Sequence, residues 1–333
     1  MMDKKLEEDL IEKVKRHPYA LGEIDDQTEE ICMSAVRNDG QSIYYVKNQT
    51  EAVCLEAVKQ DGKALQYIRN QTETICLEAV KHNGNALMYV KDQTESICLE
   101  AVRQNGVSLE YVKDQNERIC SEAVNRNVNA LKYIEDQTEE MCLEAVKRNG
   151  YMIRHVKRQT EAICLEAVKE NPNALCYVKD KTHRVCLEAV KRNGRSLFYV
   201  DNKTDDICLE AVKQDATAIE YVKNQTEEIC LEIIKKGGRY LSYVENQTDT
   251  ICEEALKSDF NGSIRLIEIK NKSIAMIVLE ASLHHAKNKV ILTEIIKKFK
   301  KNKEIIDFYT KHKLWKYVDF SKLKSLNKYT MMI

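Results

Sequence analysis

A 22-residue repeat is the feature of this sequence that most constrains its fold. A Gln-Thr pair, or a close variant of it, returns every 22 residues from Gln27-Thr28 to Gln247-Thr248 without an insertion. One repeat reads Q-T-E-x-I-C-L-E-A-V-K-x-N-G-x-A-L-x-Y-V-K-N, and a degenerate unit precedes the first regular one. Because self-similarity at a fixed period is typical of repeat arrays, each position of the repeat can be followed as a column through the chain.

The columns predict two short helices in each repeat. Thr50 is expected to cap a helix of about ten residues, with Glu51 favoured in its first turn by the helix dipole. Gly62 is expected to end this helix in the left-handed conformation. A second helix of about seven residues should follow. The apolar positions that these helices should bury are Val53, Cys54, Ala57, Val58, Ala64, Leu65, Tyr67 and Ile68.

Neither helix is long enough to be stable alone, so the repeats must stack. The sequence therefore predicts an all-α fold: an α-solenoid of about eleven to twelve helix-turn-helix repeats over residues 1–258, regular from about Gln27. The period fails near Asp259, and residues 259–333 are expected to form a degenerate helical cap. From residue 261 onward this segment holds 15 Lys and 1 Arg against 6 acidic residues, so it is strongly basic.

Composition agrees with a helical protein of a cytoplasm-like compartment. The chain has only 10 Gly and 2 Pro, too few for many strand turns, and it combines 43% hydrophobic with 32% charged residues. It shows neither a signal peptide nor an apolar run long enough to cross a membrane, so we expect a cytoplasmic protein that is neither secreted nor membrane-bound. The glycosylation pattern at Asn48-Gln49-Thr50 is better explained by the need for a capping threonine.

The cysteines follow the repeat. Equivalent atoms of stacked repeats should lie about 8–10 Å apart, which is too far for a disulfide and unsuited to a shared zinc ion. We therefore expect buried, reduced thiols and no metal. Cys176 alone occupies a variable column and is a candidate reactive thiol, although drift at an exposed position explains it equally simply. The column cysteines are Cys32, Cys54, Cys76, Cys98, Cys120, Cys142, Cys164, Cys186, Cys208, Cys230 and Cys252.

No catalytic or cofactor-binding motif is present in the sequence. We find no P-loop, no G-x-G-x-x-G and no H-E-x-x-H, and the seven histidines form no recurring pair with a carboxylate or a cysteine. We therefore expect neither enzymatic activity nor a cofactor. The glutamine column leaves two interpretations open: a ladder of hydrogen bonds along the stack, or a solvated linker residue.

Two columns of the second helix vary freely, and we interpret them as a protein-binding face. They lie three residues apart and should share one exposed side of the helix, with aromatic and Met members that are typical of interface anchors. Unconstrained drift of exposed positions is the alternative. The predicted partner-binding residues are Tyr44, Gln66, Met88, Glu110, Lys132, Tyr151, Arg154, Phe198 and Glu220.

The basic end suggests a different function. Clustered lysines with neighbouring aromatic side chains can bind nucleic acid or another anionic surface, so a nucleic-acid-binding or virion-associated structural protein is the alternative hypothesis. A buried cap kept soluble by its lysines explains the same residues. The aromatic residues concerned are Phe299, Phe308, Tyr309, Trp315, Tyr317 and Phe320.

The capping, Cys, Gly and Tyr columns of residues 1–258 together resemble a known kind of repeat. The pattern I-C-L-E-A-V-K-x-N-G-x-A-L-x-Y-V-K-N-Q-T-E-E is similar to the helical repeats of proteins from giant amoeba viruses, the mimivirus-like group. The resemblance implies an α-helical repeat array in the infected cell's cytoplasm and supplies no catalytic residues. Because solenoids expose long surfaces, the favoured hypothesis is a protein-binding scaffold that acts as a viral adaptor on host proteins. Val128, Pro172 and Ala216 depart from it at the Gly column, and His155 departs at the Tyr column.

Overall fold

The structure is a computed structural model that describes residues 3–285, 288–299, 301–319 and 321. It is 73% helical, and the described residues contain no strand. The repeating helix-turn units confirm the predicted all-α solenoid. Contacts within the chain define two units, Met1–Asp180 (unit 1) and Lys181–Ile333 (unit 2), each described here by itself.

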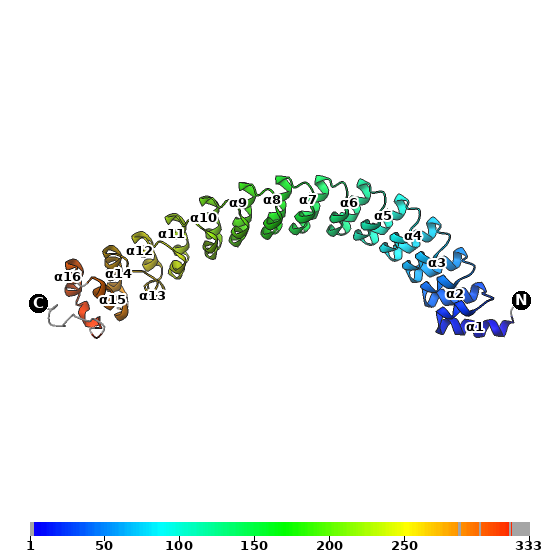
Figure 1. Ribbon diagram of the computed structural model, residues 1–333, viewed down its shortest axis with the longest axis horizontal. Helices are drawn as coiled ribbons and strands as arrows, with labels where there is room; N and C mark the ends of the chain where they lie inside the picture. Colours follow the sequence, from blue (N-terminus) through cyan, green and yellow to red (C-terminus); the bar gives the residue numbers. More distant parts are fainter. Residues whose placement is uncertain (1–2, 286–287, 300, 320, 322–333) are drawn as a thin grey trace. The chain divides into compact units, whose positions relative to one another are not determined.

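Unit 1 alternates α-helices with short 3-10 helices, which we call η helices; Figure 1 labels the α-helices. Each pair from α2 onward forms one repeat, and α1 with η1 forms the degenerate first pair. The elements are α1 (Lys4–Arg16), η1 (Pro18–Glu23), α2 (Glu29–Asn38), η2 (Gly40–Tyr45), α3 (Glu51–Gln60), η3 (Gly62–Tyr67), α4 (Glu73–His82), η4 (Gly84–Tyr89), α5 (Glu95–Gln104), η5 (Gly106–Tyr111), α6 (Glu117–Arg126), η6 (Val128–Tyr133), α7 (Glu139–Arg148), η7 (Gly150–His155), α8 (Glu161–Glu170) and η8 (Pro172–Tyr177).

Unit 2 begins with the same alternation and then changes to longer helices without the 22-residue period. The elements are α9 (His183–Arg192), η9 (Gly194–Tyr199), α10 (Asp205–Gln214), η10 (Ala216–Tyr221), α11 (Glu227–Lys235), η11 (Gly238–Tyr243), α12 (Asp249–Ser258), α13 (Phe260–Ser263), α14 (Lys272–His284), α15 (Lys289–Phe299), α16 (Lys303–Lys311) and η12 (Leu314–Tyr317).

The boundaries of each helix follow from its capping residues. The Thr50 hydroxyl accepts a hydrogen bond from the Val53 N–H at 3.4 Å and starts α3, as predicted. Asp61 ends α3 in an extended conformation, and its carboxylate accepts from the Lys63 N–H at 2.9 Å to start η3. From α2 to α10, one Asp or Asn per repeat therefore separates the α-helix from the η helix that follows it. The second element is a six-residue 3-10 helix rather than the predicted α-helix of about seven residues.

The predicted role of the glycine column is wrong. The described residues include one glycine with a positive φ, Gly237, and the column glycines are not in the left-handed region. Their role is close packing: a Cβ on Gly62 would lie 2.5 Å from the carbonyl oxygen of Ala79 in the next repeat. A side chain at this column would therefore push the next α-helix away from the turn.

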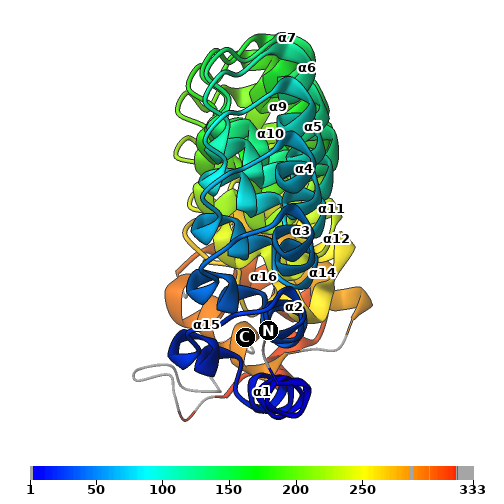
Figure 2. The ribbon, with the colours of Figure 1, turned by 90° about the vertical axis from the view of Figure 1, so that its right-hand side faces the viewer.

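Within unit 1 the repeats form two layers. Each α-helix packs on the next α-helix and each η helix on the next η helix, while every η helix also touches the α-helix that follows it. Figure 2 shows α2 to α5 of the first layer one above another. Between the layers lie the Ile or Val, Cys, Ala and Val columns of the α-helices and the Leu column of the η helices, all buried. These apolar columns form the core that the sequence predicted.

Candidate interaction surface

The exposed side of the η helices carries the two variable columns. In a 3-10 helix, residues three apart lie directly above one another, so the 3-10 geometry places both columns on one face even more closely than an α-helix would. We call this surface the η face. Tyr44, Met88 and Phe198 are 60%, 51% and 62% exposed, so large apolar side chains stand in solvent there. Gln66, Glu110, Lys132, Arg154, Glu220 and Cys176 are also exposed, and Tyr151 is half-buried.

The tyrosine column, which the sequence analysis assigned to packing, belongs to the same surface. Tyr45, Tyr177 and Tyr243 are exposed, and most other members are half-buried. Aromatic contacts join this column to the variable one: the Tyr44 ring meets the Tyr67 ring edge-on at 5.2 Å between centroids. In unit 2, Phe198 makes the same contact with Tyr221 at 5.4 Å. A tyrosine in nearly every repeat, with both an aromatic ring and a hydroxyl, was the signal available in the sequence.

Charged side chains of the η face also make cation–π contacts with these rings. The Lys132 ammonium lies 4.4 Å from the centroid of Tyr133, and the Arg195 guanidinium lies 5.7 Å from that of Tyr221. The Arg154 Nε donates to His155 Nε2 at 2.9 Å, so this imidazole nitrogen is unprotonated. Burial, with the charges of Arg154 and Lys132, lowers the pKa of His155 and keeps the ring neutral.

The glutamine column holds the η helices in place, and the ladder interpretation is confirmed with one correction. The amides do not bond to one another; each bonds to main-chain groups of two successive repeats. The Gln71 Nε2 donates to the carbonyls of Leu65 at 3.2 Å and Tyr89 at 3.0 Å, and its Oε1 accepts from the Lys91 N–H at 3.0 Å. This amide thus links the end of one η helix to the end of the next.

Two further sets of bonds join successive repeats in unit 1. The lysine or arginine that follows most η helices of unit 1 reaches back to the preceding repeat, as where Lys113 Nζ donates to the Lys91 carbonyl at 2.9 Å. The capping threonine donates to a glutamate one repeat earlier, as where Thr50 Oγ1 donates to Glu29 Oε1 at 2.8 Å. These lysines and first-turn glutamates therefore help to join successive repeats.

The cysteines of the column are buried, as predicted, and lie next to the glutamine column. Cys176 is exposed. The Cys98 thiol donates to Gln93 Oε1 at 3.7 Å, a weak bond that requires the protonated form. Burial raises the pKa of Cys98 to about 11. Among the described residues no group of three or more His, Cys, Asp and Glu side chains is arranged to hold a metal ion. The reactivity of Cys176 stays a prediction.

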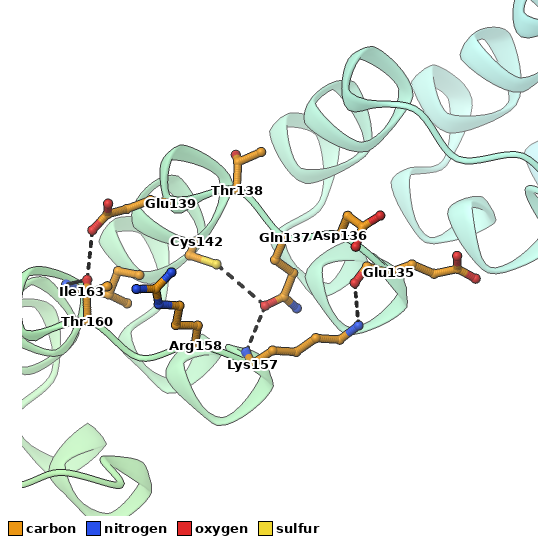
Figure 3. Close-up of a pocket in the computed structure, with 10 residues that line it drawn as sticks. All are labelled: Glu135, Asp136, Gln137, Thr138, Glu139, Cys142, Lys157, Arg158, Thr160 and Ile163. Carbon is orange, nitrogen blue, oxygen red and sulfur yellow. Dashed lines mark hydrogen bonds between the residues drawn. The ribbon is translucent and has the colours of Figure 1, made fainter.

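A pocket opens in unit 1 where the Gln137 and Gln159 repeats meet (Figure 3). Most of its polar groups are used to join the repeats: Lys157 Nζ donates to the Glu135 carbonyl at 2.6 Å, and Gln137 Oε1 accepts from the Lys157 N–H at 2.9 Å. Arg158 extends into the pocket from a column that otherwise carries Asn or Asp. The lining residues are Glu135, Asp136, Gln137, Thr138, Glu139, Cys142, Lys157, Arg158, Thr160 and Ile163.

The basic end offers less aromatic surface than the alternative hypothesis needs. Tyr309 and Trp315 are buried, and the Tyr309 hydroxyl donates to the Leu292 carbonyl at 2.6 Å. Phe299, Phe308 and Tyr317 are half-buried, and Phe320 lies outside the described residues. The described lysines of this segment are mostly exposed, so its charge is accessible although its stacking surface is not. No helix in the described part is long and apolar enough to cross a membrane.

The fold and its repeating bonds define an α-helical repeat scaffold. Comparison with protein families gives a consistent result: a domain of unknown function, DUF4116, matches residues 28–73, 50–93, 72–116, 94–137, 138–181 and 184–225. Five of these six matches begin at a capping threonine, or at the equivalent position, and each spans about two repeats. The matches cover more than half of the chain, which therefore belongs to the DUF4116 family. No curated protein and no solved structure matches it.

Proposed function

We propose that the chain is a non-enzymatic scaffold that binds a protein partner through the η face. The observation that carries this proposal is the exposure of large apolar side chains on the η helices, above all Tyr44 and Met88 in unit 1 and Phe198 in unit 2. Exposed apolar and aromatic groups of this kind tend to anchor interfaces. Their column changes at every repeat while the frame stays constant, which suits recognition of a specific sequence.

The resemblance to repeats of giant amoeba viruses supports a more specific version of the proposal. In this version the chain is a viral adaptor that works in the host cytoplasm and holds host proteins on its η face. The successive repeats, each with a different exposed residue at the column of Tyr44, supply the separate contacts that such an adaptor needs.

The proposal is tested by changing Tyr44, Met88, Arg154 and Phe198 together to Ser. All four are exposed, so circular dichroism and the thermal midpoint should stay close to those of the parent chain. Capture of partners from amoeba lysate, read by mass spectrometry, should be lost. A matched control replaces four exposed lysines of the α-helices, Lys59, Lys81, Lys147 and Lys169, and should keep capture. Retention of the same partners by the η-face variant would overturn the proposal.

The exposed lysines that the structure describes between residues 261 and 319 favour a second candidate function, binding to nucleic acid. The full chain would then be retained on immobilised DNA, with retention that falls steeply as salt rises. Replacing Lys297, Lys301 and Lys303 with Gln should weaken this retention, whereas the η-face variant should not. Elution of the parent chain at low salt, unchanged by the three substitutions, would exclude this candidate.

A further inference from the structure

A pocket of about 520 Å³ lies between α12 and α14 in unit 2, two helices that pack on each other (Figure 1). Part of its lining is apolar, since Leu256 is buried and Ile277 and Ala281 are half-buried. The other lining residues are polar and exposed: Glu253, Lys257, Glu280, His284 and His285. A volume of this size is in the range of about 300–1,000 Å³ that binding sites enclose, so several side chains fit inside.

The apolar lining stands where the repeats carry charge. The Asn271 side chain accepts from the Ile274 N–H at 2.9 Å and starts α14, as the Thr50 hydroxyl starts α3. This register places Ile277 at the column of Glu56. All ten helices from α3 to α12 have Glu at that column, and none of these glutamates is buried. The buried residues of α14 keep the spacing of the repeat core: Ile274, Ala275, Val278 and Leu279.

Therefore α14 is apolar on two sides, the one that faces the core and the one that faces the pocket. A helix of this kind is normally covered on both sides, because apolar surface is stabilised by removal from water. The terminal unit of a repeat array has the additional task of closing the core with a polar outer face. The pocket beside Ile277 is thus a surface that a further segment of chain is expected to cover.

Residues 322–333 have the composition that such a surface binds. They read K-L-K-S-L-N-K-Y-T-M-M-I, with three lysines and no acidic residue. They follow Ser321 in unit 2 and lie outside the described residues. Their apolar members match the lining that Ile277 and Ala281 provide: Leu323, Leu326, Met331, Met332 and Ile333.

The charge at the edge of the pocket complements these lysines. The Lys257 ammonium lies 2.9 Å from Glu253 Oε1 and 3.9 Å from Glu254 Oε2, so these two carboxylates already have a partner. Glu280 is exposed and makes no ion pair in the part of the chain that the structure describes. A lysine of residues 322–333 therefore has Glu280 as its available partner.

The chain is long enough to bring this segment to the pocket. The Asp319 N–H donates to Thr293 Oγ1 at 2.8 Å, so the chain passes α15 just before Ser321. Thr293 is no more than about 25 Å from His284, which lines the pocket, since five extended residues and one turn of α15 connect them. Residues 322–333 span up to about 40 Å when extended, which is sufficient to reach the pocket.

We propose that residues 322–333 bind in the pocket between α12 and α14 of their own chain. Their apolar side chains cover Ile277 and Ala281, and one of their lysines pairs with Glu280. The segment then closes the apolar surface at the end of the array. This interaction is independent of partner binding by the η face.

Photo-crosslinking of the full chain tests the proposal. The photoreactive residue p-benzoylphenylalanine takes the place of Lys257, whose side chain is 60% exposed and lines the pocket. Peptide mass spectrometry should find residues 322–333 as the main crosslinked segment. The matched control carries the probe at Lys213, the exposed residue of the same column in α10, and should give no such product. Crosslinks from position 257 to other segments alone, or to none, would overturn the proposal.

A mixture of isotopically heavy and light chains shows which copy supplies the segment. Products within one chain are expected. Predominantly heavy–light products would mean that residues 322–333 bind to a second copy, and the proposal would be wrong.

Two variants of the probe-carrying chain separate binding from folding. Ile277→Glu installs the residue of the ten preceding α-helices, so circular dichroism should stay unchanged while the crosslink yield falls about tenfold or more. Changing Lys322, Lys324 and Lys328 together to Glu leaves the pocket intact and should lower the yield about threefold or more. An unchanged yield in either variant contradicts the proposed contacts, and an unchanged yield in both removes the basis for the interaction.

Discussion

The glutamine column differs between the two units. Unit 1 keeps glutamine in seven consecutive repeats, from Gln27 to Gln159, whereas unit 2 begins with Lys181 and Lys203. A glutamine amide donates and accepts, but a lysine ammonium only donates, so it cannot accept the N–H that each Oε1 binds. Lys203 Nζ instead donates to the Val200 carbonyl, at the end of the preceding repeat, at 2.8 Å. The helices form in both units, so the apolar columns are sufficient for the fold. The glutamine amide strengthens the connection between successive repeats.

The largest effect that we expect in comparing the two units is a loss of stability at alkaline pH. Burial raises the pKa of six unit 1 thiols to about 11, so the unfolded chain ionises first and binds fewer protons at high pH. Their contribution to stability is complete below the ordinary thiol pKa and is lost as pH rises towards about 11. The loss is about 1.4 kcal/mol per thiol for each pKa unit. Urea midpoints should therefore fall by a large amount between about pH 8 and 11.

Single Cys→Ala substitutions show how much each unit contributes to this loss of stability. Cys98→Ala should reduce the pH dependence more than Cys186→Ala, because the Lys181 charge opposes the effect of burial on the pKa of Cys186. Urea midpoints that stay flat over this range, or equal effects of the two variants, would contradict the account of the thiol column.

Gln93→Leu should cost about 2–3 kcal/mol of unfolding free energy, because three main-chain groups lose their partners at once. The Tyr111 carbonyl accepts from this amide at 2.8 Å and the Lys113 N–H donates to it at 3.0 Å; the Leu87 carbonyl is the third. Lys203→Leu, the matched change in unit 2, should cost less than about 1 kcal/mol. Urea denaturation measures both, and similar losses would mean that the amide contributes nothing beyond packing.

Gly106→Ala should cost about 1–2 kcal/mol, since the new Cβ would lie 2.5 Å from the Ala123 carbonyl oxygen. Unit 2 already has alanine at this column, at Ala216, with Ile233 in place of the alanine of the next α-helix. Ala216→Gly should therefore change stability by less than about 1 kcal/mol. Thermal midpoints test the pair; a neutral Gly106→Ala would show that the repeats of unit 1 open as easily as those of unit 2.

The smallest effect that we expect is a gain in stability. Lys203→Gln restores an acceptor for the Lys223 N–H and should stabilise the chain by about 0.5–1.5 kcal/mol. Lys223→Gln changes an exposed lysine nearby without adding such a bond and serves as the control. Chemical denaturation distinguishes the two. Destabilisation by Lys203→Gln would indicate that unit 2 has adapted its packing to lysine.

The sequence predicted the helices, their caps and the exposure of residues such as Tyr44 and Phe198, because these follow from local patterns of apolarity and capping. It did not predict the role of Gly62, since a glycine satisfies a left-handed turn and a close approach equally well. It left the hydrogen-bond partners of Gln71 open, because these partners are main-chain groups that a pattern of side chains does not reveal. Six residues per η helix were too few to distinguish a 3-10 helix from an α-helix by period.

Each glutamine from Gln27 to Gln159 bonds to the main chain at the end of the η helix that follows it, as Gln71 does to the Tyr89 carbonyl. Gln247 repeats this bond on the segment after α13, where its amide donates to the Leu266 carbonyl and accepts from the Glu268 N–H. Removing or duplicating a block of 22 residues between Gln27 and Gln159 therefore gives the glutamine the same main-chain partners as before. Recombination between near-identical repeats in the gene can therefore change the number of modules while each new junction is already complete. Array length, rather than any single joint, is the property that this architecture leaves free to evolve.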